Sequence, residues 1–366
     1  MSIELTNYQE QLDHKVAELN LKLMPFITSL HTPELDIFTS TEKHYRMRTE
    51  FRVWHEGDDL YYIMFHPGTR EKYRVDTFPV AHELINGLMP AVLEYVKDKP
   101  VLRHRLFQID YLATQTGQAT ISLLYHRQLD DLWFAAAEQM RTELQRFGHI
   151  ELIGRARKQK VLVHNDRVIE TLTVNNKAYQ FEQIENSFTQ PNAQVNEKML
   201  HWALDVTQNS EGDLLELYCG NGNFSLPLAQ HFNKVLGTEI SRVSVHSAQT
   251  NIALNNIANV VIARMSAEEV AAAMRGEFES RRVDELQLQD YDFKTVLVDP
   301  PRAGLDDETL AMVQQFENIL YISCNPDTLA SNLTVLTKTH KIVRRALFDQ
   351  FPFTQHTEAG VYLTKR

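Results

Sequence analysis

The pattern of hydrophobic and polar positions changes partway along the chain. Before about residue 185, apolar positions recur at steps of three and four, as in an amphipathic helix, or alternate with polar ones around short turns, as in a β-hairpin. The pattern predicts hairpins at 48–66, 106–126 and 171–184, and helices at 8–24, 80–97 and 130–147. Hairpins separated by helices are typical of an α+β domain built on an antiparallel sheet.

Beyond about residue 185 the predicted strands are short and almost continuously apolar, with helical or loop stretches between them. These runs lie at 213–219, 234–240, 259–264, 295–299 and 319–323. Strands that are apolar on both faces and alternate with helices are typical of a parallel, doubly wound sheet. We therefore expect two domains, an α+β domain at residues 1–185 and a Rossmann-like α/β domain at residues 186–366. The charged stretch 277–292 is predicted to be a surface insertion in the second.

Composition narrows the class of protein. A chain of 366 residues with 43% hydrophobic and 23% charged residues is typical of a globular protein. No apolar run approaches the roughly 20 residues that span a bilayer, and the N-terminal stretch lacks the apolar segment of a signal peptide. The two cysteines, Cys219 and Cys324, are too few for a disulfide framework or an iron–sulfur cluster. We expect a cytoplasmic protein without a metal.

The charge of the chain is unevenly distributed. A net charge of −11 argues against a generally basic surface for nucleic acid. Local charge can differ from the average, however, and the first half of the chain contains three basic clusters. They are Arg46, Arg48 and Arg52; Arg103, His104 and Arg105; and Arg155, Arg157, Lys158 and Lys160. Each cluster is either a solvated charged face or part of a surface that binds phosphates.

A nucleotide-binding turn is indicated after the first strand of the α/β domain. The run Cys219-Gly220-Asn221-Gly222 joins a strand to a helix, and glycine lets the backbone approach a ligand closely. Glu239 ends the second strand, where a carboxylate can accept hydrogen bonds from ribose hydroxyls. An ordinary tight turn is the alternative, but the strand, turn, helix and acidic residue occur in the order that a nucleotide site requires.

The residues after this turn favour a cofactor without phosphate. A dinucleotide site has a third glycine where this chain has Ser225, preceded by the bulky Phe224. S-adenosylmethionine has no phosphate, and its sulfonium would match an acidic crevice. Glu216, Glu239 and Asp299 are the acids that we expect to line that crevice.

Two later strands and the C-terminal segment carry the residues best suited to catalysis, because the reacting groups of such folds lie at the carboxyl ends of strands. Asp299 and Arg302 flank a double proline that stiffens their loop. Cys324 leaves its strand among polar neighbours, so we interpret it as a nucleophile, whereas Cys219 is interpreted as an inert core thiol. Glu358 precedes the closing strand and is the candidate for the base that such a nucleophile would need.

These motifs carry a family resemblance. The stretches ELYCGNGNFS, VDPPRAG, ISCNP and FPFTQHTE together resemble the RNA uracil-C5 methyltransferases that use S-adenosylmethionine. The stretch at 186–192 is similar to the family's entry into its catalytic domain, and those at 44–61 and 106–111 resemble the branch that modifies tRNA. Members that act on ribosomal RNA usually carry an extra oligonucleotide-binding domain and a four-cysteine iron–sulfur site. This sequence has neither feature, which favours tRNA as the substrate.

The resemblance implies methyl transfer from S-adenosylmethionine to C5 of a uridine in the tRNA T-loop, at position 54. Cys324 is then the nucleophile that adds to C6 of the uracil, and Glu358 is the base that removes the C5 proton. Arg302 is our own candidate for stabilising the uracil enolate. The resemblance places Gln190, Tyr218, Asn223, Glu239 and Asp299 in the S-adenosylmethionine site.

The partner implied by this resemblance is the tRNA T-arm. Its target uridine must be extruded from the loop into the pocket, because C5 and C6 are inaccessible in a stacked loop. The basic clusters and exposed aromatic residues of the first domain, with Phe107 as the candidate for stacking, would hold the refolded loop. No membrane and no obligate protein partner are expected. The sequence leaves open whether other RNAs with a T-loop-like fold are modified.

Three other functions compete with this interpretation. An adenine or guanine amino-methyltransferase shares the fold, but an aromatic residue follows its prolines, where this chain has Arg302. An NAD-dependent oxidoreductase is disfavoured by Phe224 and Ser225 in the turn. A pure RNA-binding or RNA-folding module is disfavoured by the intact nucleophile and base, although an RNA-folding activity beside catalysis stays open.

Overall fold

The computed structural model describes residues 7–27, 33–66 and 68–366, which form two compact units. Unit 1 consists of Thr41–Thr171 and Glu182–Ala193. Unit 2 consists of residues 7–40, 172–181 and 194–366. The helix predicted at 8–24 thus belongs to unit 2, although the residues of unit 1 lie between it and most of unit 2 along the sequence. The domain boundary at residues 185 and 186 stays a prediction.

Within its described residues, unit 1 is built on a seven-stranded sheet in the order β4-β3-β2-β5-β6-β7-β8. Its strands are β2 (Arg48–Glu56), β3 (Asp59–Phe65), β4 (Lys72–Val75), β5 (Leu106–Ala113), β6 (Gln118–Tyr125), β7 (His149–Ala156) and β8 (Gln159–Leu162). The predicted hairpins at 48–66 and 106–126 are confirmed. Neighbouring strands are antiparallel except β6 and β7, which are parallel because α4 (Asp131–Leu144) crosses between them. The predicted antiparallel sheet is therefore a mixed one.

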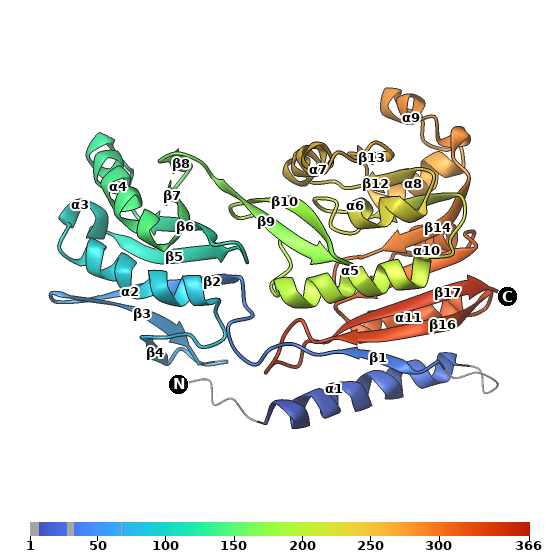
Figure 1. The fold of residues 1–366 in the computed structure, drawn as a ribbon, viewed down its shortest axis with the longest axis horizontal. Helices are drawn as coiled ribbons and strands as arrows, with labels where there is room; N and C mark the ends of the chain where they lie inside the picture. The colour runs from blue at the N-terminus through green and yellow to red at the C-terminus, as the bar shows by residue number, and fades with distance from the viewer. Residues whose placement is uncertain (1–6, 28–32, 67) are drawn as a thin grey trace. The chain divides into compact units, whose positions relative to one another are not determined.

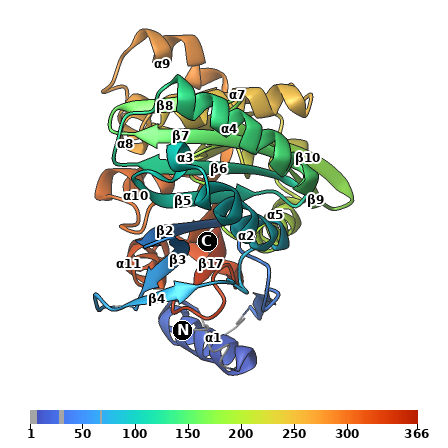
Figure 2. The ribbon, with the colours of Figure 1, turned by 90° about the vertical axis from the view of Figure 1, so that its left-hand side faces the viewer.

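The helices of unit 1 pack on one face of this sheet (Figures 1 and 2). They are α2 (Glu83–Lys97), α3 (Pro100–Arg103) and α4. Gly154 in β7 shows how close this packing is, since an added Cβ there would lie 2.4 Å from the ring of Trp133 in α4. The opposite face carries polar residues of β2 and β5.

A hairpin of β9 (Arg167–Val174) and β10 (Lys177–Ile184) confirms the one predicted at 171–184. Its turn residues, Asn175 and Asn176, have φ angles of +50° and +61°. Positive φ at both central positions is the geometry of the tight hairpin turn that Asn favours. The base of the hairpin belongs to unit 1 and its tip to unit 2.

Unit 2 contains, in its described part, an eight-stranded sheet in the order β1-β16-β17-β15-β14-β11-β12-β13 (Figure 1). The strands are β1 (Leu35–Phe38), β11 (Asp213–Leu217), β12 (Val235–Thr238), β13 (Val260–Ala263), β14 (Phe293–Val298), β15 (Asn318–Ser323), β16 (His340–Phe348) and β17 (Glu358–Lys365). All neighbours are parallel except that β17 runs antiparallel to both β15 and β16. The chain winds from β11 to β13 and then returns to place β14 on the other side of β11. Such a switch in strand order is where ligands bind in these sheets.

Helices cover both faces of the unit 2 sheet (Figure 1). On one face, a continuous apolar core includes residues of α1 (Tyr8–Leu23), α8 (Ala267–Met274), α10 (Asp307–Val313) and α11 (Pro326–Leu336). The other face carries α5 (Ala193–Thr207), α6 (Ser225–Leu228) and α7 (Arg242–Leu254). Trp202 of α5 packs on Gly360, which alternates along β17 with the core residues Ala359 and Val361. The predicted fold class, a Rossmann-like α/β domain together with an α+β domain, is confirmed.

The predicted insertion at 277–292 forms α9 (Arg281–Leu286) with exposed charges, while Val283 and Leu286 pack on the core. Short 3-10 turns complete the secondary structure: η1 (Met24–Phe26), η2 (Gln145–Phe147), η3 (Ala229–His231) and η4 (Leu288–Asp290). In the described part of the chain, no helix has both the length and the apolarity to cross a bilayer.

Candidate active site

Three motifs of unit 2 reach the same edge of its sheet. β14 and β15 are parallel, with Val298 opposite Tyr321, so Asp299 and Cys324 both follow carboxyl ends of neighbouring strands. β17 runs antiparallel to β15, with Ala359 opposite Ser323, so Glu358 begins β17 at that same edge. Strand register thus brings together Asp299, Cys324 and Glu358, which are far apart in sequence.

Arg302 connects these motifs. Its backbone carbonyl accepts a hydrogen bond of 2.9 Å from the side-chain amide of Asn325, the residue after Cys324. Its guanidinium donates to Nδ1 of His356, two residues before Glu358, at 3.1 Å. Burial, with the nearby charges of Arg302 and Lys15, lowers the pKa of His356. The ring is therefore neutral at neutral pH, as an acceptor of this hydrogen bond must be.

Glu358 is buried and Asp299 is half-buried, and neither has a counter-ion among the described residues. Glu358 is 4% exposed, and within the described residues no hydrogen bond or ion pair reaches its carboxyl group or that of Asp299. Burial and the neighbouring Asp299 raise the pKa of Glu358 well above its usual range. Burial alone raises the pKa of Asp299 to about 7. Uncompensated acids in a buried position are a common feature of sites that bind a cation or perform proton transfer.

The Cys324 thiol is half-buried, and its surroundings favour the protonated form. Burial raises its pKa to about 11, and the charges of Glu358 and Asp299 act in the same direction. Arg302 opposes them and lowers the pKa of the thiol. Since the thiolate is the reactive form of a cysteine, the charge of Arg302 favours the form in which Cys324 could act as a nucleophile.

The turn after β11 has the backbone shape of a ligand cradle. Gly220 and Gly222 have φ angles of +55° and +85°. A Cβ at Gly222 would lie 2.5 Å from the end of the Leu226 side chain, and the positive φ at this position itself favours glycine. At Gly220 no described atom lies within 4 Å of the position a Cβ would take, which leaves space beside the backbone. Glu239 holds this turn by accepting hydrogen bonds from the N–H groups of Gly220 and Ser241, at 3.2 and 2.7 Å.

Two further predicted cofactor residues belong to the same turn. Asn223 exchanges two amide hydrogen bonds, of 2.8 and 2.9 Å, with Asn196 of α5. Asn196 was missed from the sequence, although a polar residue on the buried side of an amphipathic helix is a signal for it. Tyr218 has φ of +61°, unusual for a bulky residue, and such strain is concentrated at functional sites. Burial raises the pKa of Tyr218 to about 12, so its hydroxyl remains a donor at neutral pH.

Glu216 differs from the expectation that it lines an acidic crevice. It is 1% exposed and accepts a hydrogen bond from the Ser225 hydroxyl, so it lies beneath the turn. Burial raises its pKa to about 8. Cys219 is also buried, and burial raises its pKa well above the usual range, an environment in which a thiol is inert. Gln190 belongs to unit 1, where it is half-buried, and its role at the cofactor site stays a prediction.

Arg103 of the predicted basic clusters has a structural role. Its guanidinium donates to four backbone carbonyls at distances of 2.7–3.3 Å, belonging to Gly57, Asp58, Asp59 and Lys97. The residue therefore closes the β2–β3 turn against the end of α2. Its charge is less available to phosphates than its place in a basic cluster suggested.

Two residues of the third cluster form internal ion pairs, while its other two, Arg157 and Lys158, are exposed. Arg155 forms a two-bond pair with the buried Glu185, at 2.7 and 2.5 Å. Lys160 pairs with Asp166 at 2.6 Å and with Glu185 at 3.3 Å. These pairs hold the end of β7 and β8 to the segment that follows β10. Arg155 and Lys160 are thus stabilising contacts of unit 1.

The first cluster contributes an exposed cation beside stacked rings. Phe107 of β5 and His126 lie face to face, with ring centroids 3.9 Å apart and planes at 9°. The guanidinium of Arg52 in β2 lies 5.4 Å from the centre of the Phe107 ring. Arg52 and His126 are exposed, and within the described residues no acid forms an ion pair with Arg52. We call these three residues the stacking surface; its flat ring and free charge suit unstacked bases and phosphates.

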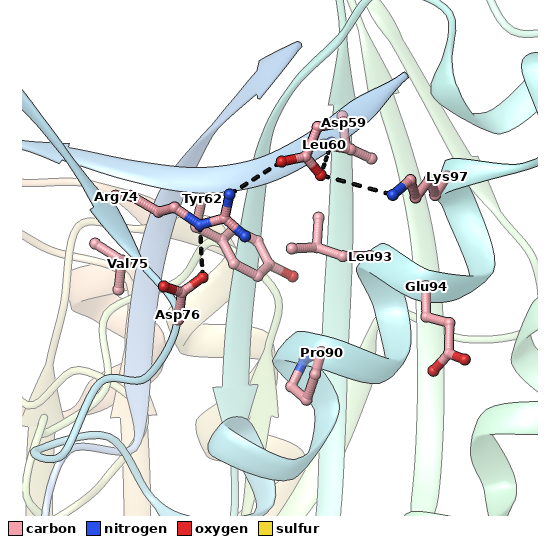
Figure 3. Close-up of a pocket in the computed structure, with 10 residues that line it drawn as sticks. All are labelled: Asp59, Leu60, Tyr62, Arg74, Val75, Asp76, Pro90, Leu93, Glu94 and Lys97. Carbon is pink, nitrogen blue, oxygen red and sulfur yellow. Dashed lines mark hydrogen bonds and ion pairs between the residues drawn. The ribbon is translucent and has the colours of Figure 1, made fainter. Parts of the chain in front are cut away.

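A cavity of about 270 Å³ in unit 1 lies between β3, β4 and α2 (Figure 3). Four of its charged side chains pair with one another: Arg74 with Asp59 at 3.0 Å and with Asp76 at 2.7 Å, and Lys97 with Asp59 at 3.7 Å. None of the predicted site residues lines it. Elsewhere too, the described residues contain no group of three His, Cys, Asp or Glu side chains that could hold a metal ion.

Comparison with known proteins identifies the family. The chain matches the tRNA (Uracil-5-)-methyltransferase family model over residues 7–366. It is 58% identical over 364 residues to a tRNA/tmRNA (uracil-C(5))-methyltransferase of Psychromonas ingrahamii, covering 100% of this chain and 99% of that relative. Its identity to the protein of the same description from Vibrio parahaemolyticus is 56% over 369 residues, with the same coverage.

A solved structure shares the fold over the full length of the chain. It is the tRNA (uracil-54, C5)-methyltransferase of Pyrococcus abyssi in complex with S-adenosyl-L-homocysteine. The TM-score is 0.72 at 21% identity, and the match covers 100% of this chain and 86% of that one. The resemblance carried by the sequence motifs is confirmed: the chain belongs to the tRNA (uracil-5-)-methyltransferase family.

Proposed function

We propose that this protein transfers a methyl group from S-adenosylmethionine to C5 of uridine 54 in the tRNA T-loop, through a covalent adduct with Cys324. The observation that carries the proposal is the meeting of Cys324, Glu358 and Asp299 at the sheet edge where the turn after β11 also lies. The family supports uracil-C5 methylation of tRNA, and the relatives are described as acting on tmRNA as well. We therefore include tmRNA as a second substrate.

The residues on the cofactor side fit S-adenosylmethionine. The open space at Gly220 admits a ligand against the backbone, and Glu239 retains acceptor capacity for ribose hydroxyls. The unpaired acid at Asp299 suits a cation. When bound, S-adenosylmethionine would supply an electrophilic methyl group. We propose that Gln190, Tyr218, Asn223, Glu239 and Asp299 hold it; the S-adenosyl-L-homocysteine in the P. abyssi enzyme supports this cofactor.

Cys324 performs the first chemical role. Its thiol loses a proton to solvent, Sγ bonds to C6 of the uracil, and the electron pair of the C5=C6 bond moves into an enolate whose charge reaches C5. Arg302 lies beside this thiol and carries the positive charge that would stabilise both the thiolate and the enolate. Without this activation, C5 is too weak a nucleophile to accept a methyl group.

Glu358 performs the second role. After C5 has been methylated, the Glu358 carboxylate removes the C5 proton, and the electron pair restores the C5=C6 bond and expels Cys324. Because burial raises the pKa of Glu358, its ionised form is a stronger base than a surface carboxylate. The stacking surface of Arg52, Phe107 and His126 supports binding of the opened T-loop from which the uridine is extruded.

Glu358→Gln tests this mechanism, because glutamine keeps the shape of the side chain but cannot accept the proton. Addition and methyl transfer precede the step that needs the base, so a methylated RNA–protein adduct should accumulate. Free product should form at least about 100-fold more slowly than with the wild type. The measurement is label from the methyl donor migrating with the protein on a denaturing gel, with the exposed Glu279→Gln as a matched control.

Two outcomes would contradict the assignment. An inactive Glu358→Gln enzyme without any adduct would show that Glu358 acts before the methyl transfer or only holds its loop. Full activity would place the base elsewhere.

A further inference from the structure

Helix α1 carries a charged side chain on its apolar face. Lys15 lies three residues after Leu12 and four before Leu19, and all three are buried in unit 2. Lys15 is 2% exposed, and a lysine is almost never buried to this extent unless it is paired. The groups that Lys15 contacts show which segment of unit 2 is attached to α1.

Lys15 binds the beginning of the loop that joins β16 to β17. Its Nζ atom lies 2.8 Å from Oδ1 of Asp349, which is itself 2% exposed, and donates to the backbone carbonyl of Phe351 at 2.8 Å. Charge-assisted hydrogen bonds excluded from water are stronger than exposed ones. Lys15 therefore fixes both a side chain and the backbone at the start of this loop.

The preceding turn of α1 holds the middle of the same loop. The Gln11 amide donates to the carbonyl of Thr354 at 3.3 Å and accepts a hydrogen bond from the N–H of Phe353. The Tyr8 and Phe353 rings lie 5.8 Å apart. Phe353 has φ of +59°, a conformation that a bulky residue keeps only when its surroundings impose it.

The far end of the loop is the candidate active site. His356 contacts Arg302, and Glu358 begins β17 beside Cys324. Two turns further along α1, Lys22 forms an ion pair of 2.6 Å with Asp327, three residues after Cys324. One helix is thus attached to both segments that carry the proposed nucleophile and base.

We propose that α1 acts as a clamp on the loop at residues 349–357, and that Lys15 is a positioning residue that sets Glu358 and the His356–Arg302 pair against Cys324. The proposal rests on the function proposed above for those residues. Lys15 touches none of the reacting groups and acts through the loop. Its charge contributes to the lowered pKa of His356, along with burial and Arg302, and so helps to keep that ring an acceptor.

Two variants separate positioning from folding. Lys15→Met alone leaves Asp349 buried without a partner, which destabilises a protein. The double variant Lys15→Met/Asp349→Leu removes both charges and keeps the buried volume, so its melting temperature should stay close to that of the wild type. The exposed Lys338→Met is the matched control.

We expect the double variant to lose at least about tenfold in kcat, since small misplacements of reacting groups are costly, while KM for RNA and for the methyl donor stays within about twofold. The kcat deficit should grow as pH falls, because without the Lys15 charge His356 is protonated at a higher pH and then repels Arg302. The groups that face His356 in this argument are Arg302 and Lys15.

A double variant with wild-type kcat and an unchanged pH profile would overturn the clamp. A deficit equal at all pH values and accompanied by a lower melting temperature would also overturn it, since that result indicates structural loss only. Failure of the proposed function would be visible separately, because the wild type itself would then form no adduct with RNA.

Discussion

The protonated state of Cys324 leads to a quantitative prediction for the first chemical step. With a thiol pKa of about 11, roughly one molecule in a thousand carries the thiolate at about pH 8, and the fraction changes tenfold per pH unit. If the thiolate is the attacking species, the rate of adduct formation should rise about tenfold per unit between about pH 7 and 9.

Arg302→Gln is the perturbation that tests the source of this profile. The guanidinium lowers the pKa of Cys324, so its removal should shift the profile toward higher pH without changing the slope. A shift of one unit corresponds to about 1.4 kcal/mol and would slow adduct formation about tenfold throughout that pH range. Arg302→Lys keeps the charge and should recover part of the lost rate.

The assay is rapid-quench trapping of the protein on a T-arm RNA that contains 5-fluorouridine, which cannot lose a proton from C5. The adduct is counted on a denaturing gel at each pH. A rate that stops rising near pH 8 in the wild type would refute the reasoning, because a neighbouring base would then remove the thiol proton in the complex. Equal rates for Arg302→Gln and the wild type at every pH would show that the guanidinium does not act on Cys324.

Three further predictions address the thiols, the turn and the RNA surface. Cys324→Ala should abolish methylation and the adduct while both substrates still bind, whereas Cys219→Ser should keep most of the activity. The reverse result in a methylation assay would show that Cys219, and not Cys324, is the nucleophile. Glu216 has a folded pKa of about 8 against an ordinary 4.5, so the wild type loses stability as pH rises through this range. The Glu216→Gln side chain carries no charge at any pH. Its free energy of unfolding, measured with a denaturant, should therefore gain about 1.4 kcal/mol per pH unit relative to that of the wild type between about pH 5 and 8. The same pH dependence of this free energy in both proteins would contradict the raised pKa of the buried carboxyl. Phe107→Ala should weaken T-arm binding by about 1–3 kcal/mol in an anisotropy titration and leave binding of the methyl donor intact; unchanged affinity would place the RNA elsewhere.

The sequence predicted those parts of the fold that depend on local pattern. Apolar runs located β11 to β15, and Asn175 and Asn176 located the turn of the β9–β10 hairpin. What it could not reveal is long-range pairing. β1 lies beside β16, with Leu35 opposite Arg345, although the two strands stand at opposite ends of the sequence. No local periodicity carries that information, so the assignment of α1 and β1 to unit 2 comes only from the structure.

Candidate site residues could be named from the sequence where their chemistry is unusual for their position, as for Cys324 at a strand end. Their contacts could not be predicted where the partner is backbone or a distant amide. Arg103 looked like a phosphate ligand because carbonyl acceptors leave no trace in a sequence. Glu216 looked like a crevice acid because the pattern does not show which side of the strand faces Ser225. Lys15 did leave a signal, a lysine within an apolar stripe, but its partner Asp349 lies 334 residues away.

The position of β17 between β15 and β16 has a consequence for how the protein matures. Because β17 follows both strands in sequence, β15 cannot acquire its neighbour on that side until the β16–β17 hairpin has been formed and added. Pairing over long sequence separations is slow, and until it occurs the edge of β15 is open to other chains. Glu358 begins β17, so the proposed base takes its place beside Cys324 only when this hairpin has joined the sheet.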